Sequence, residues 1–392
     1  MSNAFNVVVV GAGINGACTA FELASRGLKV ALVERLHVGE GPSGRSSAII
    51  RTHYSNRLTA AMALYSLRVF QRFAEVYDGG TCGFQNVGFV VLVSRKDLDG
   101  LRANLAMHQQ VGIRAELISV ADLAALLPGA YTDDLEAVGY EPESGYCDPY
   151  LTVNSVVQAA RGRGVRLFQV TTATAVTLQG GRAAGVVTDQ GELAAGAVVI
   201  AGGPWAPALA RSVGVELPLN PCRVQVAFFR PPAGHDAPFP VVADFINATY
   251  FRPETGGLTL VGLVDPVEAN YVVDPDRYDE RLDRDFVLDA GERLVRRRPL
   301  MEQGGSAGGY AALYDITPDW HPVIDEAPEG SGVFLCAGFS GHGFKLGPAV
   351  GRMVADMVMG VEAPLFDARL FRLSRFAEGD PVRGRYEYSI AG

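Results

Sequence analysis

The sequence predicts an α/β protein built in two lobes, and two observations support this fold class. Three separate stretches read as a buried strand that runs into a glycine-rich turn, at residues 7–16, 197–205 and 333–343. The chain also has 392 residues, which exceeds the size at which one hydrophobic core keeps growing, so two lobes are the default. Its 48% hydrophobic and 20% charged residues supply ample core for both.

The first stretch is the most complete. Residues 7–10 are four consecutive valines without polar alternation, which is typical of a strand buried on both faces of a parallel sheet. The glycines at 11, 13 and 16 follow, then helix formers at 17–25, then a second strand at 29–33 that ends in Glu34. A strand, glycine triplet, helix and strand with an acid roughly 20 residues beyond the glycines is the arrangement that binds a dinucleotide.

Each part of this unit has a separate task. Gly11 permits the tight turn, Gly13 lets a pyrophosphate approach bare backbone, and Gly16 lets the helix pack on the strand. The helix N-terminus offers unpaired N–H groups and the positive end of its dipole to the phosphates. Glu34 would accept hydrogen bonds from both hydroxyls of the adenosine ribose, and a carboxylate there disfavours a 2′-phosphate. We therefore expect a bound dinucleotide.

Composition excludes several other classes. The net charge of −9 argues against nucleic acid as a partner. The five cysteines are odd in number and contain no CxxC pair, so we expect a reducing compartment without disulfides, and no metal-binding set is visible. The N-terminus enters the first strand directly and no apolar run reaches about 18 residues, so we expect no signal peptide, no membrane span and a cytoplasmic protein.

Further elements follow from periodicity and turn residues. The loop at 39–47 consists of small and hydroxyl residues that could lie against a flat cofactor. Helices are expected at 56–76, 97–111, 119–127, 149–160, 275–297 and 347–360. Strands are expected at 84–93 (a pair), 166–170, 175–178, 184–188, 197–200, 218–230, 250–254, 258–262 and 333–337.

Five motifs, taken together, resemble the D-amino-acid oxidase superfamily of FAD enzymes. They are the opening unit, Ser43-x-Arg45 with Ile49-Ile50-Arg51, Ala201-Gly202-Gly203-Pro204-Trp205, Thr317-Pro318-Asp319, and Gly338-Phe339-Ser340-Gly341-His342-Gly343-Phe344-Lys345. Within the superfamily, the sequence is similar to the sarcosine oxidase and glycine oxidase branch, including sarcosine oxidase β subunits and the β subunit of archaeal proline dehydrogenase. The resemblance runs in the same order from about Val7 to Gly360.

This resemblance implies a fold and a division of the chain. The fold is a glutathione-reductase-type FAD-binding Rossmann domain, discontinuous in sequence, with an α+β substrate domain built on a mixed sheet. The FAD-binding domain would comprise residues 1–83, 146–217 and 306–362. The substrate domain would comprise 84–145 and 218–305, and 363–392 would form a C-terminal tail.

The resemblance also implies the residues that bind FAD. They are Gly11, Gly13, Ile14, Asn15, Gly16, Glu34, Arg35, Ser43, Arg45, Ser46, Ser47, Val176, Ala201, Gly202, Trp205, Gly338, Ser340, Gly341, His342, Gly343, Phe344 and Lys345. Relatives that bind flavin covalently have a cysteine five residues before the Thr-Pro-Asp motif, where this chain has Ala312. We therefore expect FAD to be held noncovalently.

The implied chemistry removes a hydride from the carbon next to an amine, passes it to flavin N5, and leaves an imine that hydrolyses. A carboxylate on this small amine substrate would bind Arg51 and Lys345, and Lys345 is one of only three lysines in the chain. Tyr250 matches a tyrosine over the substrate, although a core aromatic is an equal alternative. The alternatives for His342 are a base and a residue that orients backbone, and His53 is a second candidate base. A further alternative is that proton abstraction needs no dedicated residue.

The electron acceptor and the rival functions stay open at this point. Monomeric sarcosine oxidases activate dioxygen with a lysine in the strand that matches 258–263, where Thr259 is the nearest counterpart. A dehydrogenase that uses another acceptor is therefore an alternative to an oxidase. The rivals are a 2-hydroxy acid oxidoreductase and a flavin-carrying subunit of a multi-subunit amine dehydrogenase, so a homo-oligomer or a partner subunit is also open. An aromatic hydroxylase is discounted, because the only late Gly-Asp pair, Gly379-Asp380, lies outside any strand context.

Overall fold

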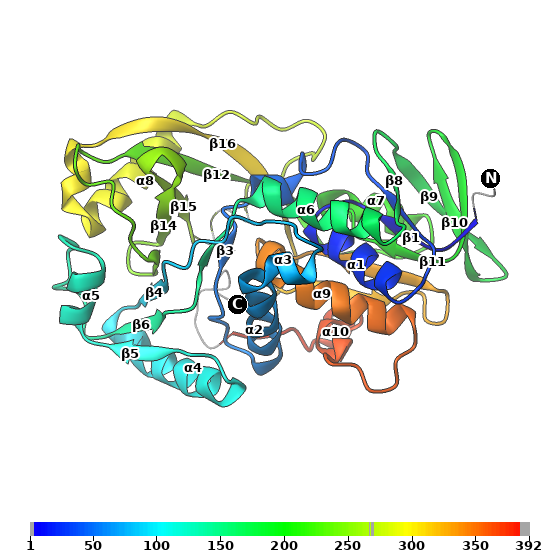
Figure 1. The fold of residues 1–392 in the computed structure, drawn as a ribbon, viewed down its shortest axis with the longest axis horizontal. Coiled ribbons are helices and arrows are strands. Elements are labelled where there is room, and N and C mark those ends of the chain that lie inside the picture. Colours follow the sequence, from blue (N-terminus) through cyan, green and yellow to red (C-terminus); the bar gives the residue numbers. More distant parts are fainter. Residues whose placement is uncertain (1–3, 266, 268–269, 385–392) are drawn as a thin grey trace.

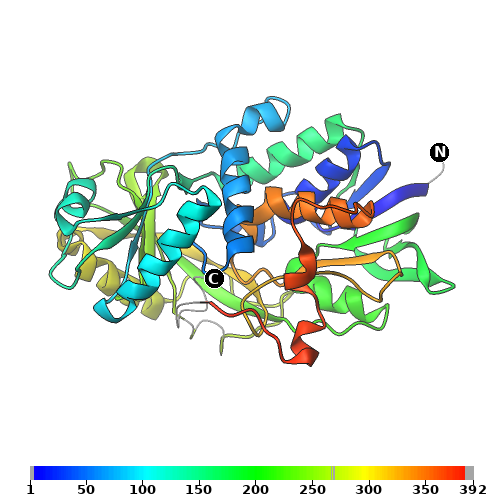
Figure 2. The same ribbon diagram turned by 90° about the horizontal axis from the view of Figure 1, so that it is seen from below.

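The computed structural model describes residues 4–265, 267 and 270–384. Two large sheets lie side by side along the molecule, each in its own lobe (Figure 1). The helix α2 (Arg57–Gln71) stands between the lobes, where it packs against α9 (Gly343–Val358) on one side and α4 (Leu98–Val111) on the other (Figure 2). This arrangement confirms the predicted α/β class with two lobes.

The first sheet has eight strands. Its order is β17 (Val323–Glu326), β18 (Val333–Ala337), β11 (Gly191–Ile200), β1 (Ala4–Val10), β2 (Val30–Val33) and β8 (Arg166–Phe168), while β10 (Arg182–Thr188) pairs with β11 and β9 (Ala173–Gln179) pairs with β10. The five strands from β18 to β8 run parallel, and β17, β9 and β10 are antiparallel additions. The central valines Val7, Val8 and Val9 are fully buried because helices or β strands cover both faces of the sheet.

Helices cover this sheet on both faces. On one face, α1 (Ile14–Ser25) lies between α6 (Pro149–Gly162) and α9, and their apolar residues form one core with α2 and the short α3 (Phe73–Val76) (Figure 1). On the other face, α7 (Ala206–Arg211) packs in a second core with residues of β9 and β10. The strand-turn-helix unit predicted for 6–34 is therefore present as an element of a doubly covered sheet.

The second sheet also has eight strands and carries the other lobe. Its order is β16 (Gly305–Ile316), β12 (Asn220–Arg230), β15 (Leu258–Leu263), β14 (Thr249–Glu254), β13 (Val241–Asp244), β4 (Phe89–Leu92), β6 (Val138–Glu141) and β5 (Glu116–Ile118). Only β13 and β4 pair in parallel, so the sheet is mixed, as the resemblance implied. The helices α5 (Val120–Leu126) and α8 (Arg284–Arg297) contribute to a core on one part of this sheet. Other residues of β4 and β13, such as Phe89 and Val241, belong to the same core as α1, α2 and α9.

Short elements complete the described chain. β3 (Ile49–Ile50) pairs with β7 (Gly145–Tyr146) between the lobes, and α10 (Arg375–Glu378) lies in the tail. The 3₁₀ helices are η1 (Pro42–Arg45), η2 (Arg95–Asp97), η3 (Gly203–Trp205), η4 (Thr255–Gly257), η6 (Pro299–Gln303) and η7 (Ala368–Phe371). None of the helices in the described ranges combines the length and apolarity that crossing a bilayer requires.

The strand expected at 197–200 begins six residues earlier, at Gly191, as β11. Four more predicted elements were wrong in extent. The helix expected at 275–297 begins only at Arg284, because the backbone of 279–281 instead accepts hydrogen bonds from the Arg223 side chain. The strand pair expected at 84–93 is the single strand β4, because Gly88 adopts a positive φ of 81° and Gln85 makes only an isolated bridge. The helix expected at 56–76 ends at Gln71, and α3 follows as a separate turn.

The last of these corrections bears on the site. The helix expected from 347 begins at Gly343, so α9 contains the residues predicted to form a loop. Gly341 makes the turn with a φ of 85°, and the N-cap position falls on His342. Lys345 consequently lies in the first turn of the helix.

The proposed division into domains stays a proposal. β16 begins at the predicted boundary near 305 and runs beside β12 in the second sheet, whereas β17, β18 and α9 belong to the first lobe.

Candidate functional site

The first strand-to-helix junction is shaped by three glycines with different neighbours. Gly11 has a φ of 105°, and a Cβ built on it would lie 2.3 Å from the carbonyl oxygen of Ala201. A Cβ on Gly16 would lie 1.9 Å from the carbonyl oxygen of Gly11. Backbone packing therefore excludes side chains at both positions.

Gly13 differs from these two. Its φ of −67° is open to any residue, and a Cβ there would meet only the Ser43 side chain, with Oγ at 2.9 Å. The same Ser43 Oγ accepts a hydrogen bond from the N–H of Ile14 at 3.1 Å. The packing of the protein alone therefore does not require glycine at position 13. This is the position where a pyrophosphate would approach the helix N-terminus.

Glu34 directly follows β2 at the edge of the same cavity. Its Oε2 accepts the N–H of Ala12 at 2.9 Å, and its Oε1 accepts the N–H of Leu36 at 3.0 Å. These two bonds hold the carboxylate beside the glycine turn, and each oxygen retains lone pairs for a ribose hydroxyl.

Arg35 and Trp205 both contact Asp276, a residue that was not predicted from the sequence. The guanidinium of Arg35 lies 4.7 Å from the centre of the Trp205 ring. Both side chains contact Asp276 Oδ1, Arg35 through Nη1 at 2.6 Å and Trp205 through Nε1 at 2.8 Å. Asp276 lies in the stretch wrongly expected to be helical, so no periodic signal could have identified it.

The loop at 39–47 lies against the same space. Arg45 pairs with Glu280 at 2.8 Å and donates to the Tyr278 hydroxyl at 3.0 Å. Ser46 Oγ accepts the N–H of Ala48 at 3.0 Å, and the Ser47 carbonyl accepts a hydrogen bond from Arg252. The loop is therefore held to both lobes.

These segments enclose a cavity of about 350 Å³. Most of the predicted FAD-binding residues line it: Gly11, Gly13, Ile14, Asn15, Glu34, Arg35, Ser43, Arg45, Ser46, Ser47, Ala201, Gly202, Trp205, Gly341, Gly343 and Phe344. Thr171, Thr172, Ala173 and Thr174 also line the cavity, although they were not predicted from the sequence. The three threonine hydroxyls in this short segment were the one sequence feature that could have indicated them. All three glycine-rich junctions thus meet at one cavity.

Other predicted cofactor residues do not line this cavity. Gly16 lies behind the helix turn, and Val176 is buried in the second core, where its N–H donates to Ser212. Gly338 donates its N–H to Asp315 Oδ2 at 2.8 Å, and Ser340 Oγ accepts the N–H of Thr317. These last contacts shape the turn before α9.

A second cavity of about 70 Å³ adjoins the first, since Ser46, Ser47, Tyr250, Leu263, Tyr314, Gly341 and Phe344 line both. All four residues predicted to act in catalysis, Arg51, Tyr250, His342 and Lys345, also line it. Tyr250 lies on β14, where its ring occupies the space that a side chain at Gly262 would need. The structure therefore brings the predicted catalytic residues together.

Two cations dominate the electrostatics of this smaller cavity. Arg51 donates to the His53 carbonyl, and its guanidinium lies 4.5 Å from the centre of the Tyr54 ring. Lys345 is buried, and burial followed by the charge of Arg51 holds the pKa of its ammonium well below the usual value. An anion placed between the two would relieve this repulsion.

His342 is also buried beside these cations. Burial first, then the charges of Lys345 and Arg51, hold the pKa of its imidazole well below the ordinary value, so the ring is neutral at physiological pH. Its Nδ1 lies 3.4 Å from the Tyr54 hydroxyl. Since His342 is the N-cap residue of α9, it lies at the turn that the helix requires.

Comparison with known proteins agrees with this geometry. A family model named DAO, described as FAD dependent oxidoreductase, matches residues 6–357. The chain belongs to this family. It is therefore an FAD-dependent oxidoreductase, and the resemblance predicted from the sequence is confirmed.

Similar curated proteins match nearly the whole chain. It is 29% identical to "Probable sarcosine oxidase" of Arabidopsis thaliana, over 98% of this chain and 95% of that protein. It is 28% identical to "Sarcosine dehydrogenase, mitochondrial" of Homo sapiens over 90% of this chain, but it spans only 39% of that longer protein.

Solved structures of other proteins share the fold. L-proline dehydrogenase from P. horikoshii superposes with a TM-score of 0.89 at 24% identity, covering 97% of this chain and all of that one. Glycine oxidase from Geobacillus kaustophilus gives a TM-score of 0.82 at 26% identity, covering 95% and 99%. These matches confirm the predicted fold class.

The larger cavity fits FAD on its own features. Three glycine-rich turns line it, and the N-terminus of α1 faces it. Apart from Gly13 and its two chain neighbours, no backbone atom of the described residues lies within 4 Å of the position that a Cβ of Gly13 would take. Ala312, which stands where covalent relatives carry cysteine, lies on β16 and lines this cavity.

Proposed function

We propose that this protein oxidises the carbon–nitrogen bond of a small amino acid or N-alkyl amino acid, with noncovalently held FAD. The observation that carries the proposal is that Arg51 and Lys345 line one small cavity beside the dinucleotide cavity. Arginine binds a carboxylate bidentately and lysine adds a second cation. Relatives named for sarcosine, glycine and proline, all small amino acids, support this substrate class.

The residues that would hold FAD are those of the larger cavity. Gly13 and the N-terminus of α1 would receive the pyrophosphate, Glu34 the adenosine ribose, and the turn 341–344 the flavin ring. When bound, FAD supplies the acceptor for a hydride equivalent. Backbone N–H groups of the turn would favour the negative charge that reduction places on the ring.

Arg51 and Lys345 would orient the substrate by its carboxylate. Burial and the charge of Arg51 depress the pKa of Lys345, so its ammonium form depends on a nearby negative charge. The substrate carboxylate would supply that charge, and Lys345 would then take up the proton of the substrate ammonium group and leave the substrate amine neutral. A neutral amine is the form that releases a hydride, so no further base is required at this step.

We infer that the electrons pass to an acceptor other than dioxygen. Monomeric sarcosine oxidases carry their oxygen-activating lysine in the strand that matches β15, and the nearest counterpart in this chain is the buried Thr259. Comparing oxygen uptake with reduction of an artificial dye during turnover tests this inference. A cytoplasmic location and association with a second copy or a partner subunit remain predictions from the sequence.

Anaerobic bleaching of the bound flavin tests the main proposal. We expect a panel of amino acids and N-methyl amino acids to include compounds that bleach the flavin and release ammonia or an alkylamine. Bleaching by 2-hydroxy acids alone would contradict the proposal in favour of hydroxy acid oxidation. Failure of every compound would favour a flavin-carrying subunit that needs its partner.

A further inference from the structure

Three buried side chains of metal-ligating type converge next to the segment that carries Arg51. His53 follows β3, His108 lies on α4 and Glu141 ends β6. One donor atom from each lies within 4.8 Å of the other two. All three residues are 2% exposed or less, and this is the one such group among the described residues. Burial at this depth sets them apart from a surface cluster of acids.

One oxygen of the Glu141 carboxylate is held by hydrogen bonds, and the other oxygen accepts none from the described residues. Its Oε2 accepts the N–H of Thr52 at 2.9 Å and the hydroxyl of Ser144 at 2.7 Å. Its Oε1 is buried, accepts no hydrogen bond from the described residues, and lies 4.0 Å from Nδ1 of His53. That separation is too long for a hydrogen bond. A buried carboxylate oxygen of this kind is costly unless a cation compensates it.

His108 is oriented in the manner of a metal ligand. Its Nε2 lies 2.8 Å from the carbonyl oxygen of Tyr54 and 3.3 Å from the Tyr54 nitrogen. The shorter contact makes Nε2 the N–H donor, so Nδ1 carries the lone pair. Metal-binding histidines typically donate the other ring N–H to a backbone carbonyl in this way, which fixes the tautomer and the ring.

We propose that His53, His108 and Glu141 bind one divalent transition-metal ion of the zinc class. Two imidazole nitrogens and one carboxylate oxygen suit Zn²⁺, which sits about 2.0–2.2 Å from each donor. Neighbouring donors of a tetrahedral ion are then roughly 3.3 Å apart, so the side chains close on the ion by about 1.5 Å at most. Three protein ligands leave a fourth position, and His53 lines the smaller cavity, which gives the ion a route of entry.

The ion would tie together three parts of the fold. His53 lies two residues after Arg51, whose guanidinium donates to the His53 carbonyl, while α4 and β6 belong to the other lobe. Metal binding therefore fixes the segment that presents Arg51 to the cavity. The nearby positive charge of Arg51 weakens binding, so the affinity should be modest for a site with three protein ligands.

Zinc titration of the FAD-loaded full chain, after chelator treatment, tests the site independently of amine oxidation. We expect one Zn²⁺ per chain by calorimetry and elemental analysis. Glu141→Gln and His108→Leu should each weaken binding at least about tenfold. The matched control His235→Ala, at an exposed histidine, should bind as the wild type does. No stoichiometric zinc in the wild type, or equal affinity in all variants, would overturn the proposal.

A second measurement covers the case in which the variants fail to fold. X-ray absorption of the zinc-loaded wild-type protein reports the ligand set directly. We expect two imidazole nitrogens and at least one oxygen in the coordination shell. A shell with sulfur, or with no imidazole, would exclude this cluster as the site.

Discussion

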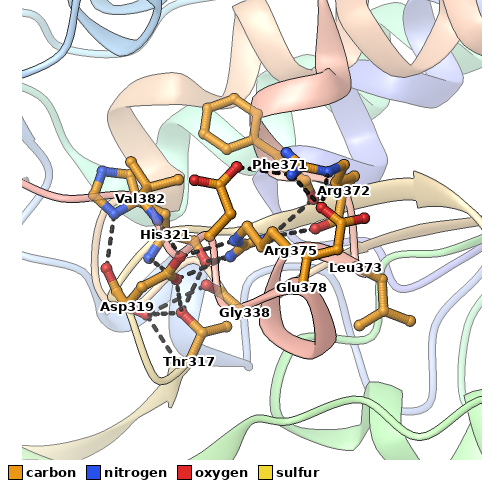
Figure 3. Close-up of polar contacts among 12 residues, drawn as sticks. Thr317, Asp319, His321, Gly338, Phe371, Arg372, Leu373, Arg375, Glu378 and Val382 are labelled. Carbon is orange, nitrogen blue, oxygen red and sulfur yellow. Dashed lines mark hydrogen bonds and ion pairs between the residues drawn. The ribbon is translucent and has the colours of Figure 1, made fainter.

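Arg375 and Asp319 form a bidentate ion pair that is almost completely shielded from solvent (Figure 3). Arg375 Nε contacts Asp319 Oδ2 at 2.8 Å, and Nη2 contacts Oδ1 at 2.9 Å. The remaining N–H groups of the guanidinium donate to the carbonyls of Phe371, Arg372 and His321, so all five donors are used. The pair ties the tail helix α10 to the Thr-Pro-Asp motif that follows β16.

Removing Arg375 should destabilise the protein far more than removing its neighbour. Arg375→Ala leaves the buried Asp319 carboxylate unpaired, so we expect a loss of about 3–5 kcal/mol in unfolding free energy. Arg372→Ala is the matched control. Arg372 pairs with Glu378 and Asp380 at the surface, where ion pairs contribute little, so its removal should leave the unfolding free energy nearly unchanged. Urea unfolding at equal FAD saturation measures both, and equal losses would contradict the assignment.

Gly13 and Gly16 should respond differently to alanine. Gly16→Ala places a Cβ against the backbone of Gly11, so we expect a lower melting temperature with or without FAD. Gly13→Ala should fold normally but bind FAD at least about tenfold more weakly, a loss of about 1.4 kcal/mol. Fluorescence titration of apoprotein with FAD, together with circular dichroism, separates the two. Unchanged FAD affinity in Gly13→Ala would contradict the proposed pyrophosphate position.

Arg51→Ala and Lys345→Met should raise KM while leaving flavin content intact. Each removes a charged partner of the substrate carboxylate, worth roughly 1.5–3 kcal/mol, so we expect an increase of about 10–150-fold. Arg57→Ala is the control, because Arg57 is exposed, lies six residues after Arg51 in the chain, and contacts Gln110 instead. Loss of the yellow colour in both site variants would show that they are structural.

Asp315 should make stability depend on pH. Burial raises the pKa of its carboxyl to about 6, so the folded state holds its proton more tightly than the unfolded state does. The free energy of unfolding therefore falls as pH rises from about 4 to about 6. Above that range it stays lower by roughly 3 kcal/mol. Asp315→Asn keeps an acceptor for the N–H of Gly338, and it should flatten this part of the stability–pH curve. An unchanged curve would refute the assignment.

Acid precipitation should release all of the flavin. Ala312 offers no thiol where covalent relatives attach it. We expect the yellow colour in the supernatant and a white pellet. A yellow pellet would reveal a covalent bond elsewhere in the chain.

The opening unit could be predicted in detail, because its signals are local. Four valines, three glycines and Glu34 fall within 28 consecutive positions, 7–34, and turn chemistry acts over just such distances. Element ends were less predictable. The Arg223 side chain, about 60 residues away, prevents the early start of α8, and no short window contains that contact.

The sequence by itself determined the fold class and predicted the dinucleotide-binding unit and the two basic residues Arg51 and Lys345, because periodicity and turn residues act along the chain. Only the tertiary structure decided that Arg51 and Lys345 share one small cavity, that Asp276 joins Arg35 to Trp205, and that Glu141 and His108 meet next to the segment that carries Arg51. The physical reason is that these side chains come from separate elements. Their meeting depends on how two sheets and the helices between them pack, and local sequence does not encode that packing.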